Sequence, residues 1–248
     1  MKKVIIIGAT SGIGRELARL YLQAGWAVGI TGRRVELLDS FRNEHSSHKI
    51  DTAVKDPIVE TECFDVRENK NVEHLKNLIN KLEGLDLLVY NSGYGEVSKS
   101  LDWEIDKRIY ETNVKGFIEI VNYTFNHFIK QGYGQIAATS SIASVRGNSQ
   151  APAYSASKAF MSVYMEGLHI KAKKMKANIA ITDIQPGFVQ TKEIKLTGVF
   201  WVVPLKKAAR QIFKAIEKKK WRVYISRRWW LIPKLLNFVP SFIYHRFG

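Results

Sequence analysis

Short runs of Val, Ile and Leu alternate along the chain with stretches of helical spacing, and this alternation constrains the fold most. We expect strands at 3–7, 27–31, 58–64, 85–90, 135–139, 179–184 and 222–225. Apolar residues at helical spacing predict helices at 13–24, 71–82, 103–130, 155–175 and 205–217. Most strand runs are apolar without clean alternation, as in parallel strands covered on both faces. The sequence therefore predicts an α/β fold, a doubly wound parallel sheet of about seven strands with helices on both faces.

Two segments interrupt this alternation. Residues 43–57 are polar, which predicts a surface connection. Residues 227–248 are aromatic and basic and add no further strand–helix unit. No repeat or Pro/Gly/Ser-rich linker divides the rest. We therefore expect a single domain over 1–226 and a C-terminal tail over 227–248, packed on the domain or on a membrane surface.

The single cysteine, Cys63, excludes an internal disulfide framework and fits a reducing compartment. Its strand-like neighbours predict a buried apolar thiol rather than a nucleophile. The apolar run after Met1 is too short for a secretion signal, and a first strand explains it better. No stretch has the roughly 18–20 uncharged apolar residues that span a bilayer. We expect a cytoplasmic protein, with membrane association through the tail as an open alternative.

The formal net charge is +15, and it is concentrated late in the chain, where no Asp or Glu follows Lys218. Such a charge predicts attraction to phosphate ligands, nucleic acid or a membrane surface. No helix-turn-helix, zinc or RNA-binding motif accompanies it, so we expect no nucleic-acid partner. The six histidines show no ligand spacing, so we expect no metal.

Three glycines follow the first predicted strand and open the first predicted helix. At such a turn the backbone can approach a pyrophosphate closely, and N–H groups of the helix N-terminus face the anion. The spacing is Gly-x-x-x-Gly-x-Gly, and a tight strand–helix turn without a ligand is the alternative. The loop residues expected to hold a dinucleotide are Gly8, Thr10, Ser11, Gly12, Ile13 and Gly14.

Arg33 and Arg34 end the second predicted strand, where an NAD-binding protein would carry an acidic residue for the ribose 2′-hydroxyl. Their fork-shaped guanidinium groups suit a 2′-phosphate. The alternative is a solvated pair that begins the next helix. We expect NADP(H) to be preferred over NAD(H).

Tyr154 and Lys158 lie four residues apart, hence on one face of a predicted helix. A free phenol has a pKa of about 10 and shuttles protons poorly at neutral pH. A nearby ammonium favours the phenolate, so we expect Lys158 to lower the pKa of Tyr154. Such a pair can exchange a proton with an oxygen whose carbon exchanges hydride with a nicotinamide.

With these motifs in this order, the chain resembles the short-chain dehydrogenase/reductase family over roughly 3–191. The resemblance implies a Rossmann-like fold, and five more segments match the family's pattern. These are Asp65-Val66, expected against adenine; Asn91-Ser92-Gly93, with Ser92 at the usual alanine; Asn113; Ser141, thirteen residues before Tyr154; and Pro186-Gly187 with Val189 and Thr191, expected beside the nicotinamide.

The resemblance implies an oxidoreductase that reduces a carbonyl to an alcohol with NADPH. Tyr154 would donate the proton, and Lys158 would also hold the nicotinamide ribose. Ser141 would orient the carbonyl. Asn113 would support a chain of water molecules that returns a proton to Tyr154. The alternative is an NADPH-binding regulator or scaffold without turnover, and a sugar-nucleotide epimerase ranks lower because its glycine spacing usually differs.

The tail leaves three interpretations open: an apolar wall over the active site, a membrane-interface segment, or a subunit contact. The first two imply an apolar, lipid-like ketone as substrate. The apolar 192–203 loop, which covers the substrate in relatives, agrees with this. Relatives commonly pair through the two long helices, predicted here at 103–130 and 155–175, so we expect a homodimer or homotetramer.

Overall fold

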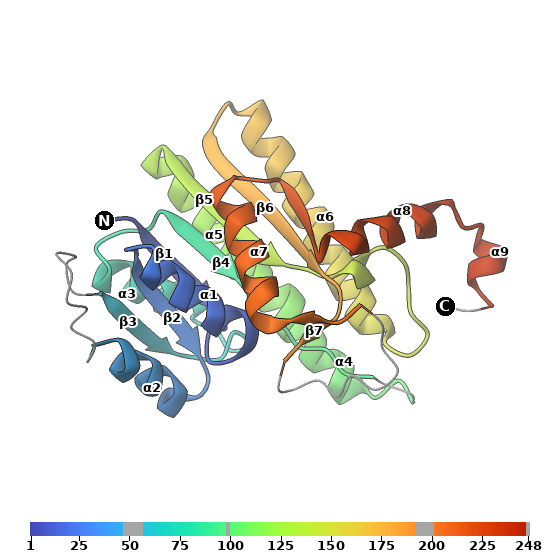
Figure 1. Cartoon of the computed structure of the whole chain (residues 1–248), viewed down its shortest axis with the longest axis horizontal. Coiled ribbons are helices and arrows are strands. Elements are labelled where there is room, and N and C mark those ends of the chain that lie inside the picture. The colour runs from blue at the N-terminus through green and yellow to red at the C-terminus, as the bar shows by residue number, and fades with distance from the viewer. Residues whose placement is uncertain (47–56, 98–99, 192–200, 247–248) are drawn as a thin grey trace.

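The computed structural model describes residues 1–46, 57–97, 100–191 and 201–246. Seven parallel strands form one sheet in the order β3-β2-β1-β4-β5-β6-β9 (Figure 1). Their bounds are β1 Lys3–Ile7, β2 Ala27–Gly32, β3 Val59–Cys63, β4 Leu87–Tyr90, β5 Tyr133–Thr139, β6 Asn178–Pro186 and β9 Arg222–Ile225. The predicted doubly wound α/β fold is confirmed, and each of the seven predicted strands is present.

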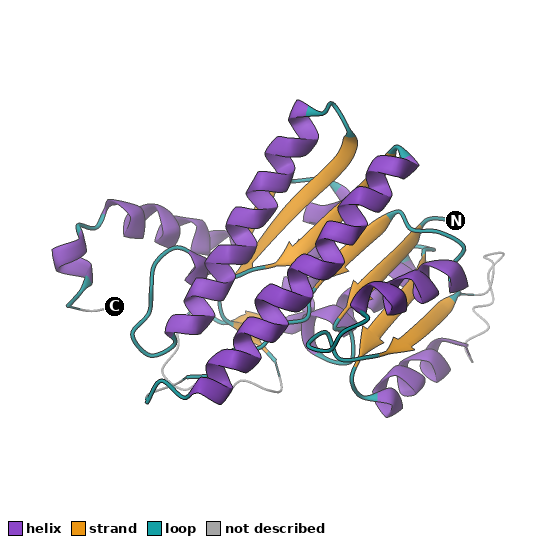
Figure 2. Cartoon of the chain, turned by 180° about the vertical axis from the view of Figure 1, so that it is seen from behind, coloured by secondary structure: helices purple, strands orange, loops and turns teal. Residues whose placement is uncertain are grey.

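Helices cover both faces of the sheet (Figures 1 and 2). On one face lie α1 (Gly12–Gln23), α2 (Val35–Ser46) and α7 (Leu205–Glu217). On the other lie α3 (Asn71–Lys81), α5 (Gly116–Gln131) and α6 (Pro152–Lys174), with α4 (Trp103–Tyr110) ahead of α5. The central strands are buried on both faces because each apolar layer takes alternate side chains, such as Ile5 and Ile6.

Three local features differ from the sequence-based expectation, and a fourth prediction falls mostly outside the described residues. The polar 43–57 segment begins inside α2, which the sequence did not predict. A π-helical turn at Glu111–Lys115 divides the expected 103–130 helix. Cys63 is exposed, so the prediction of a buried thiol is wrong: it ends β3 at the sheet edge, and its side chain leaves the core. The predicted 192–203 loop lies largely outside the described residues, which resume at Trp201.

The tail is helical. After β9 come a 3₁₀ turn (Arg227–Trp230), α8 (Leu231–Phe238) and α9 (Ser241–Tyr244). Figure 1 shows α8 and α9 leading away from the sheet, beyond β6 and α6. A two-stranded pair of β7 (Val189–Gln190) and β8 (Val203–Pro204) lies before α7. In the described parts of the chain, no helix has the length and apolar character to cross a membrane.

Candidate active site

Three positions of the turn between β1 and α1 require glycine, two of them through backbone conformation and two through close packing. Gly8 and Gly12 have φ of +82° and +55°, in the left-handed region that favours glycine. A Cβ on Gly8 would lie 2.7 Å from the Ser92 backbone, and one on Gly14 would lie 2.2 Å from the Gly8 carbonyl oxygen. The strand end, the loop after β4 and the N-terminus of α1 therefore approach one another closely, as a pyrophosphate cradle requires.

Asn91 joins three strand ends beneath this turn. Its Nδ2 donates to the Gly8 carbonyl oxygen (3.1 Å), and its Oδ1 accepts from the Thr139 hydroxyl (3.1 Å). Thr191, which follows β7, also reaches the turn, since its methyl would lie 3.6 Å from a Cβ on Gly12. Segments far apart in the sequence thus meet at the carboxyl edge of the sheet, where ligands bind in open α/β sheets.

Both arginines predicted to select the cofactor lie beside the glycine turn. The Arg34 Nη2 donates to the hydroxyls of Thr10 (2.9 Å) and Ser11 (3.3 Å). The Arg33 guanidinium, which is exposed, lies 3.5 Å from the Asp65 carboxylate. Two cationic donors therefore flank the region between the ends of β1 and β2.

Asp65 has a second cationic partner that the sequence reasoning missed. Arg67 Nη2 lies 2.7 Å from Asp65 Oδ2, and its Nε also donates to the carboxylate. Burial alone would raise the pKa of Asp65, but the hydrogen bonds and charge of Arg67 outweigh it and lower the pKa. The neighbouring Val66 is buried, and its carbonyl would lie 2.4 Å from a Cβ on Gly116, which packs it against the start of α5.

Tyr154, Ser141 and Lys158 meet between β5 and the start of α6. Ser141 caps the 3₁₀ turn Ile142–Ser144, and its hydroxyl is hydrogen-bonded to the Tyr154 hydroxyl. The Lys158 Nζ lies 5.8 Å from the centre of the Tyr154 ring and donates to the Thr139 carbonyl (2.9 Å). A Cβ on Gly95 would lie 2.6 Å from Tyr154 ring carbons, so this loop packs directly on the ring.

The electrostatics of this pair differ from the prediction. Burial raises the pKa of Tyr154, and the Ser141 hydrogen bond is the influence that opposes it. The expected net lowering of this pKa is wrong: the phenol is deeply buried, and its desolvation, which disfavours the anion, is the largest influence. Burial lowers the pKa of Lys158 to about 8, against the charge of Asp183, which raises it. At neutral pH the site therefore contains a neutral phenol and a largely protonated lysine.

Asn113 lies in the π-helical turn and is fully buried. Its Oδ1 accepts from the Tyr94 N–H (2.9 Å), while its Nδ2 donates to the Tyr94 carbonyl (2.8 Å) and the Ser157 hydroxyl (2.9 Å). It thus joins the loop over Tyr154 to the helix that carries Tyr154. π-Turns often occur at functional sites. The water chain expected at this residue stays a prediction.

Behind the site lies a buried polar cluster that the sequence analysis did not predict. Asp183 on β6 is fully buried and accepts hydrogen bonds from Ser140 (2.5 Å), Ser162 (2.7 Å) and Gln185 (2.7 Å). Arg222 on the neighbouring β9 completes it, with Nε 3.0 Å from Asp183 Oδ2. The cluster fixes the end of β5 and the middle of α6, which carry Ser141 and Lys158. The sequence signal that could have indicated this cluster is Asp183, an acidic residue inside an otherwise mostly apolar strand.

Aromatic side chains lie at the end of β6. Gly187 is in contact with Trp229 from the tail, whose indole would lie 2.3 Å from a Cβ on that glycine. The Trp229 ring is 5.6 Å from Phe188 and 5.5 Å from Trp201, in edge-on geometry. The predicted Pro186–Val189 segment is thus flanked by an apolar aromatic cluster.

The sheet order, the glycine turn and the Ser–Tyr–Lys group together define a nucleotide-binding α/β protein of the oxidoreductase type. The family model described as "short chain dehydrogenase" matches residues 2–197. The chain belongs to the short-chain dehydrogenase/reductase family. In the described parts of the chain, no group of three or more His, Cys, Asp or Glu could hold a metal ion.

Relatives agree with this assignment, and a solved structure shares the fold. An uncharacterized oxidoreductase of Myxococcus xanthus is 33% identical over 80% of this chain and 76% of its own. Sulfoacetaldehyde reductase 2 of Chromohalobacter salexigens is 30% identical over 76% of this chain and 73% of its own. The solved structure of a variant actinorhodin polyketide ketoreductase with NADPH superposes with a TM-score of 0.76, at 21% identity, over 90% of this chain and 95% of that one.

Proposed function

We propose that this chain is an NADPH-dependent reductase that converts a ketone to an alcohol. The observation that carries the proposal is the Tyr154 phenol, hydrogen-bonded to Ser141 and close to the buried Lys158 ammonium. These groups lie at the same sheet edge as the glycine turn, so a dinucleotide held by the turn can reach them. A relative named as a reductase and a structural neighbour solved with NADPH support the same reaction class.

The residues at the turn fit the proposed cofactor. Gly8 and Gly14 let the end of β1, the loop after β4 and the N-terminus of α1 approach one another closely, and next to Gly12, of the described residues, only Thr191 lies within 4 Å of a Cβ. Arg33 and Arg34 offer guanidinium donors for a ribose 2′-phosphate, the group that separates NADPH from NADH. Asp65 lies against Arg33 and so borders the same end of the site. When bound, NADPH supplies the hydride.

The proton chemistry belongs to the protein. Because burial raises the pKa of Tyr154, the phenol keeps its proton at working pH, and release of that proton to the carbonyl oxygen depends on the nearby Lys158 ammonium. Ser141, already hydrogen-bonded to Tyr154, is placed to hold that oxygen. Once Tyr154 has lost its proton, the Lys158 ammonium stabilises the phenolate. Asn113 positions the loop that packs on the Tyr154 ring. We propose that the water chain that returns a proton to Tyr154 begins near Asn113.

We further propose that the substrate is apolar or lipid-like. The cluster of Phe188, Trp201 and Trp229 lines the end of β6, next to the segment expected at the nicotinamide. Phe188 and Trp201 are each more than a third exposed, so they present aromatic surface to a ligand. An apolar wall of this kind favours hydrocarbon over a charged chain.

A screen of ketones of increasing chain length, followed by NADPH oxidation, tests this function, with NADH in parallel. We expect catalytic efficiency to rise with apolar chain length, and NADPH to be preferred. Preference for short charged carbonyls would contradict the substrate class. Tight NADPH binding with no turnover across long-chain and steroid ketones would favour the non-catalytic regulator instead.

We propose, finally, a cytoplasmic homodimer or homotetramer. The outer face of α6 exposes Phe160, Val163 and Ile170, and α5 lies alongside it (Figure 2). Exposed apolar side chains at helical spacing favour contact with a second copy of the helix pair. Light scattering should report twice or four times the 28.3 kDa chain mass, and Val163→Glu should lower it.

A further inference from the structure

The C-terminal arm, defined here as residues 227–246, is rooted in the domain at Trp229. Trp229 is 2% exposed and lies against Gly187. Beyond it, α8 and α9 lead away from the sheet (Figure 1). The arm therefore has a fixed base and a long surface that the rest of the described chain leaves open.

The apolar face of α8 is turned outward. Leu231, Leu235 and Phe238 follow at i, i+4 and i+7, a spacing that puts them on one face of the helix. They are 42%, 60% and 86% exposed, and Phe242 on α9 is 71% exposed. A surface helix normally turns such a face to the core. Here the face requires an external apolar partner.

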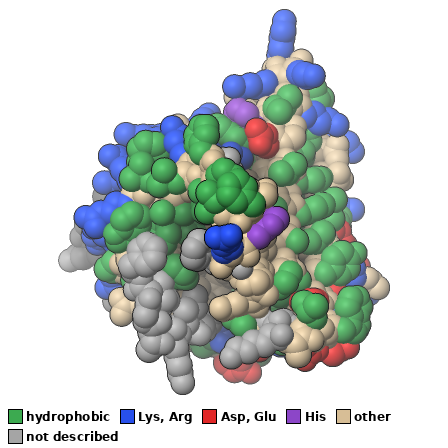
Figure 3. All heavy atoms as spheres, turned by 90° about the vertical axis from the view of Figure 1, so that its right-hand side faces the viewer, with side chains coloured by type: hydrophobic (Ala, Val, Ile, Leu, Met, Phe, Trp, Pro, Cys, Tyr) green, Lys and Arg blue, Asp and Glu red, His purple; other side chains and the backbone are tan. Residues whose placement is uncertain are grey.

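The charge around this face indicates which partner. Arg227, Arg228, Lys234 and Arg246 are exposed along the arm, and no acidic residue follows Lys218. Lys234 lies 4.6 Å from the ring centre of Trp230. Figure 3 shows hydrophobic and basic side chains side by side on this end of the molecule. Two copies of the arm would bring like charges together, whereas an anionic lipid surface accepts both the aromatic and the basic side chains.

We propose that the arm docks this protein on anionic membrane surfaces. Phe238, Phe242 and Leu235 enter the boundary between headgroups and acyl chains, and the basic residues face the lipid phosphates and carboxylates. Each basic residue near such a surface strengthens binding about fivefold. Docking rests on the arm alone and does not require the proposed reductase activity.

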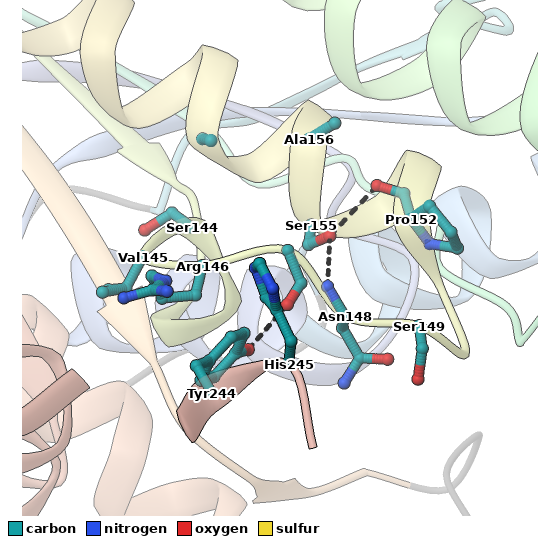
Figure 4. Close-up of a pocket in the computed structure, with 12 residues that line it drawn as sticks. Ser144, Val145, Arg146, Asn148, Ser149, Pro152, Ser155, Ala156, Tyr244 and His245 are labelled. Atoms are coloured by element: carbon teal, nitrogen blue, oxygen red, sulfur yellow. Dashed lines mark hydrogen bonds between the residues drawn. The ribbon is translucent and has the colours of Figure 1, made fainter. Parts of the chain in front are cut away.

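The arm is held in place by the loop after Ser141. Arg146 Nη1 donates to the carbonyls of Leu236 (3.0 Å) and Val239 (3.1 Å), and its guanidinium lies 4.4 Å from the ring centre of Tyr244. The Tyr244 hydroxyl donates to the Gly147 carbonyl (2.6 Å; Figure 4). Membrane docking therefore orients the active-site edge of the domain with respect to the lipid.

A cavity of about 750 Å³ lies between this loop and the arm. It is lined by the 144–149 loop, the first turns of α6, and Tyr244 and His245 (Figure 4). None of Ser141, Tyr154 and Lys158 is among its described lining residues. The cavity therefore borders both the arm, through Tyr244 and His245, and the turn of α6 that follows Tyr154, through Ser155 and Ala156.

Vesicle flotation of the full chain tests the proposal. Vesicles contain phosphatidylcholine alone, or phosphatidylcholine and phosphatidylserine in equal parts. The test variant is Leu235→Ser/Phe238→Ser/Phe242→Ser, and the control is Ile58→Ser, since Ile58 is 40% exposed ahead of β3, away from the arm and from the outer face of α6. The native chain and the control should float with the phosphatidylserine vesicles. The triple variant should bind at least about tenfold more weakly, because each buried Phe contributes more than that.

Three results would overturn the proposal: no flotation of the native chain, equal binding of native chain and triple variant, or equal binding to both vesicle types. A drop in oligomer mass of the triple variant without vesicles would assign the face to a second copy of the chain instead. Far-UV circular dichroism and NADPH binding check that the variants fold. Reductase activity of the triple variant on a water-dispersed ketone separates a failed docking proposal from a failed proposed function.

Discussion

Replacing Asp183 with Asn should change both the stability of the protein and its pH profile. The carboxylate is fully buried and pairs with Arg222 while accepting hydrogen bonds from Ser140, Ser162 and Gln185. Asn has nearly the same size but no charge. Its NH₂ group is itself a donor, so it cannot accept the hydrogen bonds that the carboxylate accepts. The substitution therefore removes the counterion of Arg222 and leaves a donor without its acceptor.

The cost in stability follows from this geometry. Removing one partner of a buried ion pair costs about 3–5 kcal/mol. The Arg222 side chain keeps 26% of its surface exposed, so solvent screens its charge and we expect the lower end, about 3 kcal/mol. A chain of this size loses roughly 2–4 °C of Tm per kcal/mol, so Tm should fall by about 6–12 °C.

The pH profile should move as well. Lys158 is charged at pH values below its pKa. Burial lowers this pKa to about 8, and the negative charge of Asp183 opposes the lowering. If the Lys158 ammonium is required, reduction is sustained below this pH and declines as the pH rises through it. Without the Asp183 carboxylate, the pKa of Lys158 falls further. The decline in kcat/KM should therefore begin at a lower pH in Asp183→Asn.

Differential scanning fluorimetry and kcat/KM for NADPH oxidation across neutral and alkaline pH measure the two effects. Asp86→Asn is the matched control, since Asp86 accepts from the Lys3 backbone N–H (2.7 Å) at the opposite edge of the sheet. It should lose only about 1 kcal/mol and keep the native pH profile. An unchanged Tm together with superposable profiles for Asp183→Asn would refute the reasoning.

Two further substitutions probe the site. Gly95→Ala places a Cβ 2.6 Å from the Tyr154 ring, so it should displace the phenol and lower kcat by about a hundredfold. Gly167→Ala on α6 meets open space and should leave kcat unchanged; equal rates in both variants would contradict the packing argument. Arg34→Ala should raise the KM for NADPH at least about tenfold by removing charge-assisted donors, with little change for NADH. Equal losses with both cofactors would contradict a 2′-phosphate role for Arg34.

The sheet was predictable because its strands are buried on both faces. Runs such as Val4–Ile7 leave no polar face, and only a helix-covered parallel sheet accommodates several of them. Helix α2 was not predicted because only Leu38 and Phe41 of its described side chains belong to the apolar core and most of the others are polar. The π-turn at Asn113 has no sequence signal, since the spacing of apolar residues continues through it.

The motifs of the candidate site were predictable, but their electrostatics were not. The four-residue spacing of Tyr154 and Lys158 places both on one helix face, yet it says nothing about how deeply each is buried, and burial dominates both pKa shifts. Asp183 and Arg222 lie 39 residues apart, and only the strand order pairs them in register. Partners across strands and helices require the assembled fold.

Comparison of Tyr154→Phe with the native chain tests the central claim most directly. The substitution removes one hydroxyl and keeps the ring that packs against the Gly95 loop. NADPH binding, followed by fluorescence titration, should be preserved, while the rate of ketone reduction should fall by about a hundredfold or more. Reduction at the native rate by Tyr154→Phe, with NADPH bound as tightly, would show that the proton comes from elsewhere.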